Sequence, residues 1–352
     1  MGDLRVNVPA TTSTEDPSPL FELYRGSYAT ELLVVATAHL GVFGHLAKVP
    51  LSGVELARRL GLERRPFQVL MTGLRAMGTV EVDGEGRYRL TPMAEAHLVA
   101  GCPHDVGDYF SLAAASPGVL ALLERLRTNR PADADGAGAG FIYRDGIRSA
   151  MEGEAGARFF TMALAGRAKT VAPVLAEVVS LGEAKRLLDV GGGTGLYSLA
   201  FLRANPGLKA VVWDRPEVLR VAAEFAEGSG VQERLELRAG DMFSDPVPEG
   251  VDVVLLSNIL HDWDEAECLA LLKRLGAALV PGTRLLIHDV FLDDDLGGPL
   301  PVALYSAALF SLTEGRAYSA AEYGAMLEAT GFRVLDRKST RVHCGVLVAV
   351  RC

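Results

Sequence analysis

The sequence predicts an α/β protein, with a doubly wound, mostly parallel sheet that follows a mainly helical N-terminal domain. Three observations predict this fold class. An apolar run at 187–190 turns into glycines at 191–195, which is typical of a buried parallel strand leading into a helix. Strand-like and helix-like segments alternate after it. Before it, three helical patterns precede two alternating runs around an Asp-Gly turn at 83–84.

The composition disfavours several classes of protein, namely nucleic-acid-binding, membrane-spanning and metal-binding proteins. The chain has 352 residues, enough for two domains, with 49% hydrophobic and 22% charged residues, as in soluble globular proteins. A net charge of −9 disfavours nucleic acid as a partner, and no apolar run approaches the roughly 20 residues that span a bilayer. The four cysteines have no CxxC spacing, so we expect no metal site and a reducing, cytoplasmic location.

The N-terminal third predicts a winged helix. Residues 1–18 are polar, and we expect a disordered tail there. Ser52 and Glu55 form the signature of a capping box at the start of the second helix. The expected elements are helices over 20–49, from 52 onward and over 67–77, then strands at 79–82 and 87–90.

A winged helix raises the alternative of DNA binding. Residues 51–90 hold seven arginines and five acids, a net charge of only +2. That is a weak footprint for phosphate, so a dimerisation domain is favoured over a DNA-binding one.

Residues 106–180 are expected to be mostly helical, interrupted by a Gly/Ala/Asp-rich loop at 131–140. The helix that begins near Phe159 and Met162 carries apolar residues that suit a flat apolar ligand, although core packing explains them equally simply. Beyond it, strands are expected at 187–190, 210–213, 234–238, 251–256 and 284–290, helices at 195–204, 217–226, 265–278 and 320–330, and an edge hairpin at 332–335 and 345–350.

The glycine turn favours a nucleoside ligand. It lacks the Lys-Ser/Thr of a P-loop, and Leu196 stands where a dinucleotide fingerprint needs its last glycine. Asp214 ends the second strand of the series, where a carboxylate can hold ribose hydroxyls. Asp241 follows the third strand and His261 the fourth, so these side chains should face one crevice, although either aspartate could also serve a turn.

These motifs carry a family resemblance. LLDVGGGTG, VVWDRP, GDMF and ILHDWDE occur in the order and spacing of the S-adenosylmethionine-dependent O-methyltransferases of the plant caffeate/flavonoid type and their bacterial natural-product relatives. The resemblance implies a seven-stranded Rossmann-like class I methyltransferase sheet. It also implies a division into a winged-helix dimerisation domain at 19–105 and a methyltransferase domain at 106–352, with a substrate-lining segment at 106–180 and the Rossmann-like core at 181–352.

The resemblance also implies site residues. His261 matches the general base, and Asp289 matches an acid that orients it. Cofactor-binding residues would be Gly191, Gly193, Asp214, Arg215, Asp241, Met242, Phe243 and Ser257, the last at a position where plant enzymes often have lysine. Residues that line the acceptor would be Phe159, Met162, Asn258 and Trp263.

One position departs from the family pattern. A second acid of the family falls at Ala317, so Asp289 orients His261 alone, or Glu314 supplies the missing carboxylate, or base catalysis contributes less. The departure keeps open a C-methyltransferase or a cofactor-dependent enzyme that transfers no methyl group, such as a cyclase.

The sequence thus predicts a homodimeric O-methyltransferase that uses S-adenosyl-L-methionine, releases S-adenosyl-L-homocysteine and acts on a hydroxyl of a small aromatic or polyketide-like metabolite. No nucleic acid or membrane partner is expected. A winged-helix regulator that senses S-adenosylmethionine is the alternative from another functional class.

Overall fold

The computed structural model describes residues 8, 9, 11–130 and 154–352. The chain divides into two compact units. The sheet unit comprises Met1–Ser18, Arg148–Phe291 and Ala320–Cys352, and the helical unit comprises Pro19–Ile147 and Leu292–Ser319. The loop expected at 131–140 and most of the first ten residues lie outside the described residues.

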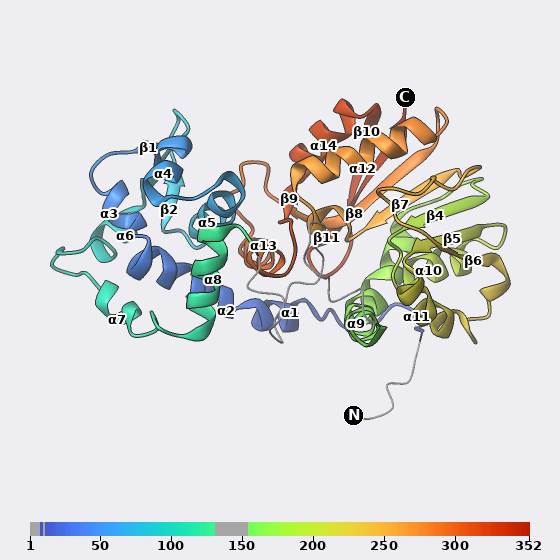
Figure 1. Ribbon diagram of the computed structural model, residues 1–352, viewed down its shortest axis with the longest axis horizontal. Helices are drawn as coiled ribbons and strands as arrows, with labels where there is room; N and C mark the ends of the chain where they lie inside the picture. The colour runs from blue at the N-terminus through green and yellow to red at the C-terminus, as the bar shows by residue number, and fades with distance from the viewer. Residues whose placement is uncertain (1–7, 10, 131–153) are drawn as a thin grey trace. The chain divides into compact units, whose positions relative to one another are not determined.

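The sheet unit contains the predicted doubly wound sheet (Figure 1). Its strands follow the order β10-β11-β8-β7-β4-β5-β6. The central pairs are parallel, whereas β11 is antiparallel to both β8 and β10, which confirms the edge hairpin. The strands are β4 (Arg186–Val190), β5 (Lys209–Asp214), β6 (Leu235–Ala239), β7 (Val253–Ser257), β8 (Arg284–Leu292), β10 (Phe332–Ser339) and β11 (Cys344–Arg351).

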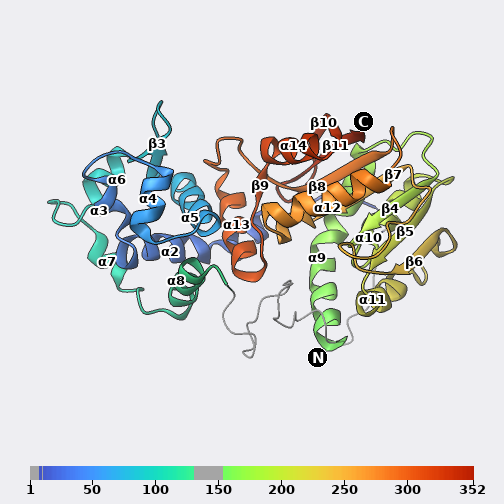
Figure 2. The same ribbon diagram turned by 45° about the horizontal axis from the view of Figure 1, so that its top comes forward.

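Helices cover both faces of this sheet. One group, α9, α10 and α11, lies on one face, and α12 and α14 lie on the other (Figure 1). Figure 2 shows the long helix α9 from the side. The bounds are α9 (Glu154–Val178), α10 (Leu196–Ala204), α11 (Pro216–Ala226), η4 (Leu260–Asp262), α12 (Glu265–Ala278) and α14 (Ala320–Ala329), with a short 3-10 turn η3 at Gln232–Arg234.

Strand composition explains why β4 and β7 occupy the centre of the sheet. Every side chain of β7 is buried, and so are four of the five in β4. Continuous apolar runs of this kind belong to strands covered on both faces. The chain winds from β4 to β5 and β6 on one side, and continues from β7 to β8 on the other. This order places the switch point, where α/β sheets bind ligands, between the ends of β4 and β7.

The helical unit has the expected helix-helix-helix-hairpin order. The capping box is present, because the Ser52 side chain accepts from the Glu55 N–H and Glu55 returns to the Ser52 backbone. The long helix expected over 20–49 is interrupted at Gly26 and at Gly41, which has a φ of 60°. The elements are α1 (Ser18–Arg25), α2 (Ser27–Val34), the π-helical η1 (Val35–His39), α3 (Val42–Leu46), β1 (Leu51–Ser52), α4 (Gly53–Leu60), α5 (Arg64–Ala76), β2 (Val80–Val82), β3 (Arg87–Leu90), α6 (Pro92–His97), α7 (Gly107–Ser111), α8 (Pro117–Thr128), α13 (Leu300–Leu312) and β9 (Tyr318–Ser319).

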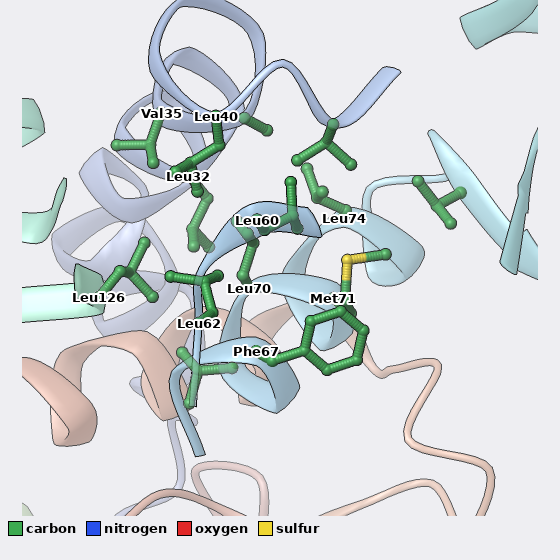
Figure 3. Packing of buried hydrophobic residues seen from close by; sticks show 14 of the residues in the cluster. Leu32, Val35, Leu40, Leu60, Leu62, Phe67, Leu70, Met71, Leu74 and Leu126 are labelled. Atoms are coloured by element: carbon green, nitrogen blue, oxygen red, sulfur yellow. The ribbon is translucent and has the colours of Figure 1, made fainter. Parts of the chain in front are cut away.

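One apolar core holds the helical unit together. Figure 3 shows Leu32 of α2, Leu70 and Leu74 of α5 and Leu126 of α8 as members of this buried cluster. Helix α13 joins this core through Leu304, Ala307 and Phe310, although it follows the sheet strands in sequence. The unit therefore combines the segment expected to dimerise with α7, α8 and α13, which the sequence division at 105 places in the methyltransferase domain.

Candidate active site

The glycine turn connects β4 to α10 in a conformation that favours glycine. Gly191 has a φ of 63° and Gly193 a φ of 58°, both in the left-handed region. The Gly191 N–H donates to the Trp213 carbonyl oxygen over 2.8 Å, which fixes the turn to the end of β5. A side chain at Gly191 would place its Cβ 2.5 Å from Ile259 Cδ1, so the backbone of the turn approaches the segment after β7 closely.

Asp214 lies beside this turn, as predicted from its place at the end of β5. Its two carboxylate oxygens accept from the Gly193 N–H over 2.8 Å and from the Arg215 N–H over 2.7 Å. Burial raises the pKa of Asp214, and these two backbone donors oppose the rise. A carboxylate has about four acceptor positions, so Asp214 keeps capacity for a ligand hydroxyl.

The segment after β6 makes a tight turn around Asp241. Its carboxylate accepts from the Phe243 N–H over 2.8 Å, and the Asp241 side chain is exposed. The Met242 carbonyl oxygen accepts from Arg274, and the Phe243 ring packs edge-on against Trp263 with centroids 4.8 Å apart. The structure thus brings together a predicted cofactor residue, Phe243, and a predicted acceptor residue, Trp263, which is only 4% exposed.

His261, in the turn η4 that follows β7, and Asp289, inside strand β8, form a buried pair. The His261 Nδ1–H donates to Asp289 Oδ1 over 2.5 Å, and the same oxygen accepts from the Val290 N–H over 2.7 Å. The other imidazole nitrogen, Nε2, lies 3.6 Å from Asp262 Oδ1. His261 is 3% exposed and Asp289 is fully buried. With Nδ1 committed to a carboxylate, Nε2 is the nitrogen that can accept a proton.

Burial and neighbouring charges shift the pKa values of both His261 and Asp289. Burial lowers the pKa of His261, but Asp289 and Asp262 outweigh burial, and the net direction is upward. Burial raises the pKa of Asp289, but His261, the Val290 N–H and Arg167 outweigh it, and the carboxyl is held below its usual range. Burial raises the pKa of Asp262 to about 7.

Tyr323, which the sequence did not single out, also contacts Asp289. Its hydroxyl donates to Asp289 Oδ2 over 3.0 Å, from helix α14. An aromatic residue in an apolar helix predicts core packing, so the sequence contained no signal for this contact.

A second buried network surrounds Ser257 and Asn258. The Ser257 hydroxyl lies 2.8 Å from His288 Nδ1, while Asn258 accepts from Arg167 of α9 over 2.7 Å and donates to Tyr197 over 3.2 Å. Burial lowers the pKa of His288 to about 3, so this histidine stays neutral. The network holds Asn258 in a left-handed conformation with a φ of 57°. Contact of Ser257 or Asn258 with a ligand stays a prediction.

The remaining predicted residues lie in two places. Phe159 and Met162 are on α9, with Phe159 59% exposed. Glu314 belongs to the helical unit, and its expected role stays a prediction. Ala317 is buried in the same unit, and its N–H donates to the Ser306 hydroxyl over 3.1 Å.

Two features are absent from the described residues. Among residues 8, 9, 11–130 and 154–352, no group of three or more His, Cys, Asp or Glu side chains could hold a metal ion. Within the same ranges, no helix has the length and apolar character required to cross a bilayer.

Comparison with known proteins identifies the family. Residues 137–333 match the model of the O-methyltransferase domain, and residues 21–100 match the O-methyltransferase dimerisation domain. The chain belongs to the O-methyltransferase family. This methyltransferase is similar to the 3-hydroxy-5-methyl-1-naphthoate 3-O-methyltransferase of Streptomyces sahachiroi, with 36% identity over 90% of this chain and 89% of the relative. It is 31% identical to the tetracenomycin polyketide synthesis 8-O-methyl transferase of Streptomyces glaucescens, over 94% of this chain and 95% of that one.

Solved structures agree with these relatives. An O-methyltransferase family 2 protein from Planctomyces limnophilus, solved in complex with apigenin, matches with a TM-score of 0.89 and 45% identity, over 99% of this chain and 100% of that one. Human N-acetylserotonin methyltransferase in complex with S-adenosylmethionine matches with a TM-score of 0.61 and 25% identity, over 97% and 99% of the two chains. The methyltransferase is therefore an enzyme of this fold, and the sensory regulator considered from the sequence is not favoured.

Proposed function

We propose that this methyltransferase transfers a methyl group from S-adenosyl-L-methionine to a phenolic hydroxyl of a small aromatic or polyketide-like metabolite, with His261 as the general base. The observation that carries the proposal is the buried pair of His261, which follows β7, and Asp289, which lies in the adjacent strand β8. S-adenosyl-L-homocysteine is the second product of this reaction.

The residues at the switch point fit the cofactor. Gly191 and Gly193 keep side chains away from the turn, and Asp214 retains acceptor capacity for ribose hydroxyls. Met242 and Phe243 follow Asp241 in the turn after β6 and offer apolar surface for an adenine ring. When bound, the cofactor supplies an electrophilic methyl group on a sulfonium.

His261 performs the proton transfer. A phenol has a pKa of about 10 and is mostly protonated at neutral pH, so its oxygen is a weak nucleophile until the proton leaves. Nε2 of His261 accepts that proton as the oxygen–carbon bond forms, and the Nδ1–H bond to Asp289 stabilises the resulting imidazolium. The raised pKa of His261 makes it a stronger base than an exposed histidine.

Relatives support the class of acceptor. One relative is named for 3-hydroxy-5-methyl-1-naphthoate, another for tetracenomycin polyketide synthesis, and a third was solved in complex with apigenin. All of these relatives are named as O-methyltransferases, which favours transfer to oxygen over transfer to carbon or a reaction without transfer.

The test is the His261→Ala variant assayed against a panel of phenols by mass spectrometry. General base catalysis typically contributes about 10²–10⁴-fold, so turnover should fall by that factor while S-adenosyl-L-homocysteine still binds. His104→Ala, at an exposed histidine of the helical unit, is the matched control. Unchanged turnover in His261→Ala would exclude His261 as the base.

We also propose that the enzyme is a homodimer, because residues 21–100 match the dimerisation domain. Light scattering coupled to size exclusion should give twice the chain mass of 37.5 kDa. A mass of one chain at micromolar concentration would contradict this assembly.

A further inference from the structure

The Asp289 carboxylate is bound on both of its oxygens. Oδ1 accepts from His261 Nδ1–H and from the Val290 N–H, and Oδ2 accepts from the Tyr323 hydroxyl over 3.0 Å. Asp289 is fully buried, and a buried carboxylate remains ionised only when donors replace the water it has lost. Tyr323 is therefore one of three donors around this carboxylate, beside His261 and the Val290 N–H, which with Arg167 hold its pKa below the usual range.

Tyr323 is itself held rigidly. Its side chain is fully buried in α14, and its ring packs edge-on against Phe291 with centroids 5.8 Å apart. Phe291 belongs to β8, the strand that carries Asp289. The hydroxyl thus reaches the carboxylate from a fixed ring, so the hydrogen bond forms with little loss of side-chain freedom.

We infer that Tyr323 is a positioning residue, which orients the Asp289 carboxylate and sets how strongly that carboxylate acts on the His261 imidazole. The inference rests on the proposed role of His261 as the base. Ala317, at the expected place of a second acid, supplies no carboxyl group, and the phenol of Tyr323 supplies a second fixed contact to Asp289, the acid that holds Nδ1 of His261.

The charged and titratable groups around His261 and Asp289 determine how the titration of His261 can be interpreted. Asp262 lies next to Nε2 of His261, while Arg167 lowers the pKa of both His261 and Asp289, and His288 is held neutral by burial. These groups stay unchanged when only the Tyr323 hydroxyl is removed. A change in His261 titration then reports on the hydrogen bond to Asp289.

Tyr323→Phe removes the hydroxyl and keeps the ring. Without this donor, the negative charge of Asp289 is less dispersed and acts more strongly on His261, so the pKa of His261 rises and the acidic limb of the kcat profile moves to higher pH. The carboxylate also loses its fixed orientation, so kcat should fall about tenfold, the scale of one hydrogen bond to a charged group, with KM nearly unchanged. Imidazole NMR of His261 measures the titration directly.

A double-mutant cycle separates positioning from a structural role. On an Asp289→Asn background, Tyr323→Phe should change kcat and the His261 titration by less than about twofold, because the charged acceptor is absent. Equal losses on both backgrounds, or no loss on the native background, would overturn the inference.

A second variant, which keeps both the ring and the hydroxyl, tests the inference even if Tyr323→Phe fails to fold. 3-Fluorotyrosine at position 323 is a stronger donor, so it should move the titration of His261 in the opposite direction, to lower pH. A shift in the same direction as Tyr323→Phe would contradict the inference. The His261→Ala variant distinguishes failure of the proposed function from failure of the role inferred for Tyr323. If that variant keeps full activity, the proposed function fails, whereas if it is inactive and Tyr323→Phe resembles the native enzyme, only the role of Tyr323 fails.

Discussion

At the residue scale, the chemistry depends on how one imidazole is polarised. His261 has a carboxylate at Nδ1 and a second, more distant one near Nε2, so its protonation is favoured from both sides. Asp262 has a pKa raised to about 7 by burial, so its charge changes in the same range in which the enzyme is expected to work. The two acids therefore have different roles, with Asp289 ionised and Asp262 titrating.

The pH dependence of the reaction follows from the raised pKa of His261. The base acts only when neutral, so kcat should fall as the pH decreases through that pKa. Asp289→Asn removes the largest charge that raises it, so the acidic limb should move to lower pH while the plateau falls about tenfold or more. Steady-state rates between pH 5 and 10 measure both effects. A limb that moves to higher pH would contradict the assigned coupling.

The sequence pointed to His261 because it follows a strand in a recognisable motif, and the family resemblance pointed to Asp289 as the acid beside it. It could not predict Tyr323, because the hydroxyl reaches Asp289 only after α14 has packed beside β8. The same limit applies to Arg167, whose bond to Asn258 joins residues 91 positions apart. Contacts between distant segments depend on tertiary packing, which a local pattern does not contain.

At the element scale, the glycine turn is packed against a buried carboxylate. A Cβ at Gly192 would lie 2.7 Å from Asp189 Cγ and 3.0 Å from Val212 Cγ1. Asp189 accepts from the Ser198 hydroxyl over 2.8 Å, and burial raises its pKa to about 7. The glycine turn therefore packs against Asp189, which α10 binds through Ser198, and against Val212 of β5.

Gly192→Ala should destabilise the fold by about 1–3 kcal/mol, because the new methyl group displaces a buried side chain. Binding of S-adenosyl-L-homocysteine should weaken in parallel. Gly166→Ala on α9 is the control, since its Cβ would meet nothing within 4 Å and alanine favours a helix. Urea denaturation and calorimetry measure the two effects. Equal stability of both variants would show that the turn tolerates the added methyl group.

The capping box gives a prediction for the winged helix. Ser52→Ala removes both the acceptor for the Glu55 N–H and the donor to the Glu55 carboxylate, so the first turn of α4 should lose about 1 kcal/mol. Amide hydrogen exchange of the first turn of α4 should increase several-fold, while exchange in α10 stays unchanged. Uniform exchange across both helices would contradict a local effect.

Strands and helices were predicted most reliably where the spacing of apolar residues clearly matched one type of element. The strands from β4 to β8 and the hairpin β2–β3 begin and end within a few residues of their expected positions. Within the helical pattern expected over 20–49, a glycine break was expected at 38–43, but the interruption at Gly26 was not, because apolar spacing continues across it. The interruptions come from backbone conformation, which periodicity does not report.

At the scale of the whole molecule, the helical unit needs two separate stretches of chain. Leu304, Ala307 and Phe310 of α13 complete a core otherwise made of residues from α2 to α8. Residues 19–130 produced alone should expose that apolar surface and bind a hydrophobic dye. Adding 292–319 through a Gly/Ser linker should restore dispersed NMR signals, and Phe310→Asp in the linked segment should abolish the gain. A well-folded 19–130 fragment would contradict this dependence.

The sequence predicted both the sheet and the winged helix, but neither a helix at 300–312 nor the return of that helix, α13, to the helical unit. Its apolar residues occur almost all around the helix, as in a buried helix of either unit. Periodicity therefore gave no indication of which core would receive it.

The placement of α13 has a consequence for how such enzymes diversify. A genetic crossover near residue 105 would transfer most of the helical unit but leave behind the helix that completes its core. The two segments, 19–147 and 292–319, must therefore change together, and a recombinant gene would need two exchanges that flank the central strands. Compatible substitutions in α5 and α13 should accordingly be inherited as a set, although about 220 positions separate them in the chain.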